Sequence, residues 1–402
     1  MSNTIRYVCL LALLTWSATA QTGKQLWLAS FDQVWQTIED KHFDPKHNGV
    51  DWRAARLELR PKVEAAASLE EARSHTEALL ARLGHSHVGI IPAAAYEDLN
   101  RENAEGTAGL RFEIIGGDAI LANGPHSGWV LREVNGRRVR ERIERAKTEL
   151  SAQFAVENML HGAVGEGLEL LLEDEAGKAH LTKVELKKPT GRLVQLGNLP
   201  PFRLELEYEK LSSETGYIRI SSFFDPEAIE ALMRRATTDC RACKGFILDL
   251  RGNPGGIAVL STAVANWFVD RSLALGTCLF RAMQLKLVTQ PRSEPFLGKL
   301  AILTDGRSMS TSEILARGLQ DLQRARVFGR RSPGLALPSV LEKLPTGDGF
   351  QYTTANYISA GGKPLEGIGV QPDVVIAPTR KQLLEGVDAT RAAARQWIEK
   401  EQ

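Results

Sequence analysis

The stretch that organises this chain is residues 304–321, TDGRSMSTSEILARGLQD, with the apolar run KLAIL at residues 299–303 directly before it. A short apolar run of this kind is typical of a buried strand, whereas the apolar residues after Ser310 repeat at helical spacing. The pattern therefore predicts a strand, a tight turn and a helix, with Ser310 at the turn. Its hydroxyl would lie beside the first amides of the helix, whose positive dipole can hold an oxyanion.

The same serine also fits a simpler role as a helix cap. Serine and threonine are favoured at helix N-termini, and a glutamate three residues after a serine forms the capping-box pattern. Ser310 and Glu313 have this spacing. The window alone leaves both interpretations open, a cap or a nucleophile.

Length and charge narrow the class of protein. The 402 residues are enough for two or three domains, and the 50 Lys and Arg residues nearly balance the 49 Asp and Glu residues. A balanced charge gives no general attraction to nucleic acid or to an anionic membrane surface. We therefore expect neither as a partner.

The first 20 residues predict a signal peptide. Arg6 supplies the positive start, residues 7–16 the apolar stretch, and residues 18–20 the A-x-A cleavage motif. The apolar stretch is too short to span a bilayer, although an uncleaved membrane anchor is the alternative. We expect a periplasmic or secreted mature protein without an integral membrane segment.

Three cysteines follow the leader: Cys240, Cys243 and Cys278. Cys240 and Cys243 have the C-x-x-C spacing of redox motifs, but no thioredoxin-like pattern surrounds them. A local disulfide or a pair of free thiols is the favoured interpretation. No second Cys or His pair lies at zinc-ligand spacing, so no metal site is expected.

The pattern of apolar residues divides the mature chain into three parts. Residues 21–100 read as helices, and residues 101–190 as a small β-rich unit with a helix over 139–150. This unit is either an embedded binding module or a plain β-insertion. Residues 191–402 alternate strands and helices, which predicts an α/β core, and residues 350–359 read as a β-hairpin arm.

A glycine-rich turn follows the most apolar strand, at residues 252–256. Neither the Walker pattern nor G-x-G-x-x-G is present, so phosphate binding is not indicated. Glycine lets backbone N–H groups approach a ligand closely. The amide of Gly255 or Gly256 could thus form an oxyanion hole with the amide of Thr311, while a tight turn without a ligand is the alternative.

A serine nucleophile needs a base, and His87 is the candidate. An imidazole with an ordinary pKa near 6.5 is basic at neutral pH. Ser86 could orient the imidazole or the substrate, and Glu366 is the most suggestive carboxylate to orient the base. The alternatives are a structural histidine and a solvated glutamate, and neighbouring His85 is expected to face solvent or the core.

Three motifs in order, at residues 245–256, 304–321 and 365–373, resemble the tail-specific (C-terminal-processing) serine protease family. The segments at 31–35, 50–52 and 86–88 are similar to the branch that includes the tricorn core protease. The resemblance implies a ClpP/crotonase-like α/β protease core, an N-terminal helical segment and an embedded PDZ-like module. It places the nucleophile at Ser310.

The resemblance also indicates which branch this chain follows. The Ser–Lys branch has the pattern G-E-P-T-Y-G-K-G, and here GRRSPGLA at residues 329–336 puts Leu335 at the lysine position. A leucine cannot accept a proton. The tricorn-like branch uses a Ser-His pair, the nucleophile and a glutamate, and these roles fall on the residues Ser86, His87, Ser310 and Glu366, with Gly255 or Gly256 and Thr311 as the oxyanion hole.

Two departures mark the turn before the serine. The family pattern N-x-G-[ST]-A-S has small residues where this chain has Arg307 and Met309. The β-rich unit also lacks a clear carboxylate-binding loop, the nearest match being residues 106–110. The sequence therefore leaves open whether this unit binds free C-termini.

We expect an exported serine peptidase acting on protein or peptide substrates, with no metal or organic cofactor. The alternatives are a non-catalytic ligand-binding relative of the same fold and an esterase using the same triad. The sequence does not indicate the physiological substrate, the cleavage preference or the oligomeric state.

Overall fold

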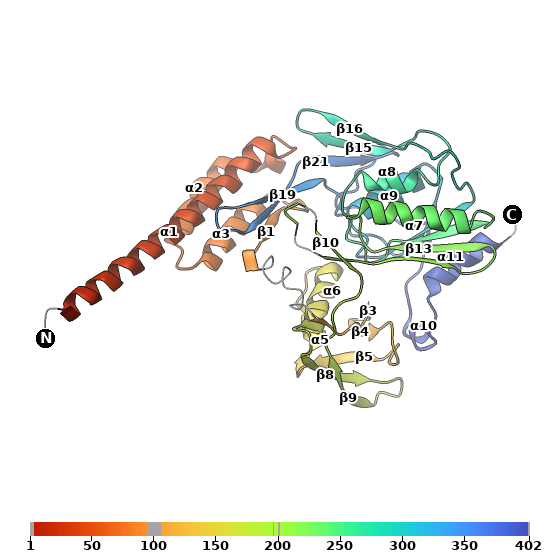
Figure 1. The fold of residues 1–402 in the computed structure, drawn as a ribbon, viewed down its shortest axis with the longest axis horizontal. Coiled ribbons are helices and arrows are strands. Elements are labelled where there is room, and N and C mark those ends of the chain that lie inside the picture. The colour runs from red at the N-terminus through yellow and green to blue at the C-terminus, as the bar shows by residue number, and fades with distance from the viewer. Residues whose placement is uncertain (1–3, 95–105, 196, 200–201, 401–402) are drawn as a thin grey trace. The chain divides into compact units, whose positions relative to one another are not determined.

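The structure is a computed structural model that describes residues 4–94, 106–195, 197–199 and 202–400, with side chains from residue 23 onward. The side chains of the predicted signal peptide thus lie outside the described residues. Within the described part, none of the helices combines the length and the apolar character that crossing a bilayer requires. The chain forms two compact units, which are described separately (Figure 1).

The first unit comprises residues 1–96, 279–284 and 337–356. Its helices are α1 (Thr4–Lys41), η1 (His47–Gly49), α2 (Trp52–Ala65) and α3 (Leu69–Ala81). Helices α2 and α3 begin at the side-chain caps Asp51 and Ser68, as capping preferences lead one to expect. Their apolar faces pack with α1 in one buried cluster that includes Phe31, Ile38 and Leu79.

A small antiparallel sheet completes this unit, with the strand order β1-β20-β19. Its strands are β1 (Gly89–Ile91), β19 (Ser339–Lys343) and β20 (Gly349–Thr353). Phe350 and Tyr352 of β20 belong to the same buried cluster as the three helices. The N-terminal helices are therefore completed by a segment almost 300 residues later in the sequence, which the sequence did not indicate.

The second unit is built on a six-stranded sheet with the order β12-β13-β14-β17-β18-β22. Its strands are β12 (Leu206–Lys210), β13 (Thr215–Ile220), β14 (Gly245–Asp249), β17 (Lys299–Thr304), β18 (Arg326–Gly329) and β22 (Val374–Val375). Only β12 runs antiparallel to its neighbour. Every residue of β14 is buried, as expected for a central strand of a parallel sheet.

Helices cover both faces of this sheet. They are α7 (Pro226–Asp239), α8 (Leu260–Ala265), α9 (Thr311–Asp321) and α11 (Ala389–Glu399). Helix α10 (Arg380–Leu384) instead packs through Leu383 on Ile120 and Val130 of the β-rich module. Ala394 and Ile398 of α11 pack on Ile247 and Ala301, and Figure 1 shows α7, α8 and α9 on the opposite face. This arrangement confirms the α/β core that the alternating pattern predicted.

The parallel register decides where the loops of the site lie. Asp249 pairs with Leu303, and Leu303 pairs with Phe328, so the carboxyl ends of β14, β17 and β18 are adjacent. The loops that follow them, residues 250–256, 305–310 and 330–336, leave from the same edge of the sheet. Ligand sites of open α/β sheets lie at this edge.

The β-rich module belongs to the second unit. Its sheet has the order β3-β4-β5-β8-β9, with β6 paired to β5. The strands are β3 (Phe112–Ile115), β4 (Asp118–Leu121), β5 (Val130–Val134), β6 (Arg137–Arg138), β8 (Gly167–Glu173) and β9 (Ala179–Glu185), and a further pair is β2 (Gly106–Thr107) with β7 (His161–Gly162). Its helices are α5 (Val139–Glu144), α6 (Glu149–Glu157) and η2 (Asn158–Leu160). Val156 of α6 packs on Phe112 of β3 in the module's own core.

Two elements differ from the sequence prediction. The helix expected over residues 139–150 is divided, because Thr148 caps a new helix, α6, through its side chain. The hairpin expected over residues 350–359 does not form. β20 pairs with β19 and β1, whereas β21 (Ala355–Ser359) pairs with β15 (Ala274–Phe280), which also carries β16 (Gln284–Val288).

Of the two interpretations of the C-x-x-C pair, a local disulfide or free thiols, the structure shows the disulfide. Cys240 and Cys243 form a local disulfide at the end of α7, with their Cα atoms 5.1 Å apart. Cys278 is a buried free thiol. A further two-stranded pair, β10 (Arg192–Val194) with β11 (Phe202–Leu204), precedes the main sheet.

Candidate active site

Ser310 begins helix α9 in a backbone conformation that residues other than glycine rarely adopt. Its φ is 55° and its ψ is −117°. Such a conformation costs free energy and persists where the surroundings impose it, often at functional sites. Here the Ser310 amide donates to the carbonyl oxygen of Leu335 (2.9 Å) and to Oε2 of Glu313 (3.0 Å). The backbone of the serine is therefore fixed from two sides.

Helix α9 begins with a capping box formed by Ser310 and Glu313. The Glu313 amide donates to the carbonyl oxygen of Ser310 (2.8 Å), and the Glu313 carboxylate accepts from the Ser310 amide (3.0 Å). Ser310 itself is partly exposed. This geometry fits both interpretations of the sequence, because a serine that takes part in a capping box can still present its hydroxyl to a substrate.

The glycine-rich turn after β14 packs directly against this serine. The Met309 amide donates to the Asn253 carbonyl oxygen (2.9 Å), and the Thr311 hydroxyl donates to the Gly256 carbonyl oxygen (2.8 Å). A Cβ atom on Gly255 would lie 2.6 Å from Cβ of Ser310. Only glycine leaves room at this position, where φ is also 99°.

Two of the three amides proposed for an oxyanion hole remain unoccupied. The Gly255 amide donates to Oδ1 of Asn253 (2.8 Å) and is therefore already engaged. Within the described part of the chain, no acceptor contacts the amides of Gly256 or Thr311. Asn253 was not singled out from the sequence, although its position inside the glycine-rich turn was a usable signal.

Glu313 is the most buried acid of the site. Its Oε1 accepts from Ser332 Oγ (2.6 Å) and the Gly334 amide (2.7 Å), and its Oε2 accepts from the Leu335 amide (2.9 Å) as well as from Ser310. Burial raises the pKa of Glu313 to about 7, although these hydrogen bonds favour the carboxylate. One carboxyl group thus joins the turn that carries Ser310 to the loop after β18.

Glu366 lies in the second unit and is hydrogen-bonded to the end of the loop after β18. Its Oε2 accepts from the Ala336 amide (3.2 Å), and the neighbouring Leu335 carbonyl accepts from Ser310. The loop around it is tied to the same segment, since the Gly367 amide donates to the Gly334 carbonyl oxygen (2.8 Å). The structure therefore brings Glu366 and Ser310 onto one connected set of loops.

His87 and Ser86 lie in the first unit. Ser86 Oγ is 2.8 Å from His87 Nδ1, which engages this ring nitrogen. His87 has a positive φ of 56°, as Ser310 does. Neighbouring His85 stacks on His42 and Phe43, with Nδ1 3.3 Å from His42 Nε2, which is a packing role.

A buried charge network supports the edge of the sheet beneath these loops. Asp249 is fully buried and pairs with Arg251, which also binds Asp388 (2.7 Å). Tyr217 donates to Asp249 (2.8 Å). Arg251 lowers the pKa of the Asp249 carboxyl against the effect of burial. The sequence analysis did not single out this network, and its acid and base lie only two residues apart in the chain.

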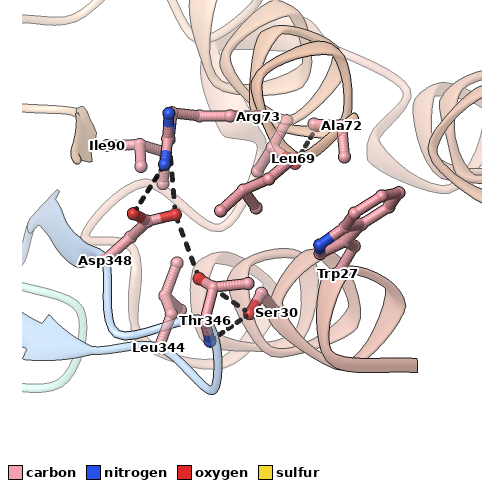
Figure 2. Close-up of a pocket in the computed structure, with 10 residues that line it drawn as sticks. Trp27, Ser30, Leu69, Ala72, Arg73, Ile90, Leu344, Thr346 and Asp348 are labelled. Atoms are coloured by element: carbon pink, nitrogen blue, oxygen red, sulfur yellow. Dashed lines mark hydrogen bonds and ion pairs between the residues drawn. The ribbon is translucent and has the colours of Figure 1, made fainter. Parts of the chain in front are cut away.

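The small pocket of the first unit is not a substrate site (Figure 2). Its volume is about 10 Å³, which is room for about a single water molecule. Figure 2 shows Arg73 paired with Asp348, which also accepts from Thr346, and Ser30 beside Thr346. These contacts join α1 and α3 to the β19–β20 loop.

Family models match two parts of the chain. Residues 214–376 match Peptidase family S41, and residues 24–74 match the Tricorn protease C1 domain. The first match contains the glycine-rich turn, Ser310, Glu313 and Glu366. The second lies in the N-terminal helices of the first unit.

Curated relatives agree with these models. A chloroplastic C-terminal processing peptidase of Tetradesmus obliquus is 23% identical over 389 residues, covering 90% of this chain and 79% of the relative. A carboxy-terminal-processing protease of Bartonella bacilliformis is 30% identical over 193 residues, covering 45% of this chain and 43% of the relative. With this bacterial relative the similarity spans less than half of either protein.

Solved structures show the fold. A photosystem II D1 C-terminal processing protease superposes with a TM-score of 0.59 at 20% identity, covering 90% of this chain and 98% of that one. Mature CPAF superposes with a TM-score of 0.66 at 12% identity, covering 94% and 97%. The predicted protease architecture is thus confirmed over nearly the whole chain. With the family models and the curated relatives, it shows a serine-type peptidase that carries a peptidase family S41 domain at residues 214–376 and a tricorn-type segment at residues 24–74.

Proposed function

We propose that Ser310 is the nucleophile of this peptidase and that His87 is its general base. The observation that carries this assignment is the geometry of Ser310, a strained and partly exposed residue at a helix N-terminus with a glycine-rich turn against it. Ser86 orients the imidazole through Nδ1, and Glu366 supports the base from the loop that also holds Ser310. The meeting of His87 with Ser310 is part of the proposal, because the two residues lie in different units.

The chemistry follows the general course of acyl transfer. His87 Nε2 takes the proton of Ser310 Oγ while Oγ attacks the scissile carbonyl carbon. The resulting oxyanion is held by the amides of Gly256 and Thr311, each donor contributing about 3 kcal/mol in comparable sites. Gly255, whose amide is engaged by Asn253, contributes space for the serine rather than a donor.

The intermediate then collapses. The C–N bond breaks as His87 gives its proton to the leaving amine, and an acyl group remains on Ser310 Oγ. Water attacks this ester while His87 takes its proton, and the acyl–oxygen bond breaks to release a carboxylic acid. Ser310 regains its proton, so the cycle uses only residues of this chain, water and a peptide.

Two further features belong to the proposal. Residues 1–20 act as a signal peptide, which their charge, apolar stretch and A-x-A motif support, and the mature peptidase is periplasmic or secreted. The module at residues 101–190 is PDZ-like, which its six-stranded sheet with helix α6 packed on an edge strand supports.

The first test is the substitution Ser310→Ala. Loss of a member of such a triad lowers kcat by about a millionfold in a related mechanism, so we expect no detectable cleavage of an unfolded protein substrate. Thermal unfolding of the variant should change by no more than the loss of one helix cap, about 1 kcal/mol, because the capping box is the only structural role of this hydroxyl that the described residues indicate. Native-rate cleavage by the folded variant would remove Ser310 from the mechanism.

A further inference from the structure

The turn that carries Ser310 is held from outside the α/β core by charges of the β-rich module. Arg307 Nη1 pairs with Glu157 Oε1 at the end of helix α6. Arg330, directly after β18, donates to Glu113 of β3 and to Glu149 at the start of α6, both at 2.7 Å. All five residues belong to the second unit. We call this set of two arginines and three glutamates the brace.

The brace reaches the nucleophile through short backbone paths. Arg307 lies three residues before Ser310, and its amide donates to Asp305 Oδ1 (2.9 Å). Asp305 Oδ1 also accepts from the Gly252 amide (3.0 Å), which belongs to the glycine-rich turn. A movement of Arg307 would therefore displace both the turn that carries the serine and the turn of the oxyanion hole.

The backbone of Arg330 is held by two hydrogen bonds to Thr304. Its amide donates to the Thr304 carbonyl oxygen (3.0 Å), and the Thr304 hydroxyl donates back to the Arg330 carbonyl oxygen (2.9 Å). Arg330 therefore connects the module to the carboxyl end of the strand that leads to Ser310. The same loop continues to Leu335, whose carbonyl accepts from the serine.

Four of the five charges of the brace are partly withdrawn from water, whereas the Glu149 side chain is 59% exposed. The side chains of Arg330 and Glu113 are each 23% exposed, and those of Arg307 and Glu157 are 28% and 29% exposed. Ion pairs that share charges in a network and are partly withdrawn from water are less screened than isolated surface pairs. Burial raises the pKa of Glu113, and the charge of Arg330 opposes this effect.

A side chain of the module itself is hydrogen-bonded to the edge strand of the module sheet. β3 is the edge strand of the module sheet, and its Phe112 carbonyl oxygen accepts from Gln153 Nε2 of α6 (3.4 Å). A peptide that added to this edge would have to displace Gln153 and would meet the carboxylates of Glu113, Glu149 and Glu157. The surroundings of this edge thus suit arginine side chains of the core better than the carboxylate of a free C-terminus.

We propose that Arg307 and Arg330 are positioning residues for Ser310, which act by bracing the nucleophile turn and the loop after β18 against the module. The proposal rests on the assignment of Ser310 as the nucleophile. It concerns this chain in particular, because the two arginines stand where the family patterns quoted above have glycine and glutamate. Neither of those residues can donate to a carboxylate with its side chain in this way.

The test is a set of charge reversals: Arg307→Glu, Glu157→Arg and the two combined. Each single reversal places two like charges next to each other at the turn that carries Ser310. We therefore expect kcat to fall about tenfold or more, while KM changes less than about twofold. The rate at which a fluorophosphonate probe labels Ser310 should fall with kcat. The double reversal restores an ion pair of opposite polarity and should recover most of both rates.

The matched control is Arg142→Glu, which makes the same change of charge on helix α5 of the module, at an exposed residue outside the brace. It should leave kcat and the labelling rate at the parent values. Arg330→Met tests the second arginine without a reversed charge, in case a reversal prevents folding. Folding of every variant is checked by its melting temperature.

The outcomes separate this proposal from the assignment on which it rests. Parent-level kcat and labelling in folded Arg307→Glu and Arg330→Met protein, together with an inactive Ser310→Ala variant, would refute the brace alone. A loss of kcat that the double reversal does not recover would also refute it. Activity of Ser310→Ala would refute the assignment of the nucleophile instead.

Discussion

Glu313 accepts four hydrogen bonds on two oxygens, and none of its donors carries a charge. The sequence identified it only as a capping residue. Its connection to Ser332 and Leu335 could not be predicted, because those residues follow a different strand and meet the glutamate only through the parallel register of β17 and β18. The candidates Ser310 and Gly256 could be predicted, since turn and cap patterns are local.

The raised pKa of Glu313 predicts how stability depends on pH. The unfolded chain ionises this group near its ordinary value of 4.5, whereas the folded protein keeps the proton until about pH 7. The contribution of Glu313 to stability is therefore complete below about pH 4.5 and is lost as the pH rises to about 7. The difference between the two values corresponds to about 3 kcal/mol.

Glu313→Gln should remove this pH dependence, because an amide does not titrate. Urea denaturation of the parent and the variant at several pH values between 4.5 and 7.5 isolates the contribution, since the other carboxyl groups are common to both proteins. We expect the difference in unfolding free energy between them to change by about 3 kcal/mol over this range, in favour of the variant as the pH rises. Two parallel curves would contradict the raised pKa.

At the scale of elements, the sequence predicted most strands but not all of their partners. Residues 350–359 alternate like a hairpin, yet only Thr354 separates β20 from β21, and a hairpin needs at least two loop residues. The Thr354 amide donates to the Pro338 carbonyl oxygen (2.9 Å), and the two strands pair with segments distant in the sequence. Alternation of apolar residues indicates that a strand is half buried, but it does not indicate which strand lies next to it in the sheet.

The link between helix α3 and the β19–β20 loop gives a prediction at this scale. The Asp348 side chain is 3% exposed, and it pairs with Arg73 at 2.9 Å and accepts from the Ala93 amide at 2.8 Å (Figure 2). Removing one member of a buried ion pair leaves an unpaired charge, so Asp348→Ala should destabilise the first unit by about 3–5 kcal/mol.

Chemical denaturation measures this loss, with Asp51→Ala as the control. Asp51 is exposed and caps helix α2, and the loss of a cap costs about 1 kcal/mol. If Asp348→Ala were no more destabilising than Asp51→Ala, the ion pair would not be what holds this loop to the helices.

At the scale of the whole molecule, the proposed site draws on both units. Ser310, Gly256 and Glu366 belong to the second unit, and Ser86 and His87 to the first. The sequence suggested the members of the site one by one, and the resemblance to the tricorn-type branch joined them into one site. Composition and periodicity could not have suggested His87, because a single histidine between a helix and a strand is common, and its role depends on a partner more than 200 residues later.

The dependence of Ser310 on His87 is the most direct test of this arrangement. A serine hydroxyl reacts slowly until a base takes its proton, and general base catalysis contributes about 10²–10⁴-fold to such a step. His87→Ala should therefore lower the rate of fluorophosphonate labelling at Ser310 by about this factor, although the substitution is made in the other unit. Mass spectrometry of the labelled peptide measures the rate at the serine itself and does not depend on the choice of substrate.

His75→Ala serves as the control, because it removes an imidazole from helix α3 of the same unit, where the ring pairs only weakly with Glu71 at 4.0 Å. It should label at the parent rate. If folded His87→Ala protein also labels at the parent rate, Ser310 obtains its reactivity from a group other than His87, and the first unit then contributes no base to the site. A loss confined to His87→Ala requires that the imidazole reach the serine hydroxyl during the reaction, because a proton is transferred only over hydrogen-bonding distance.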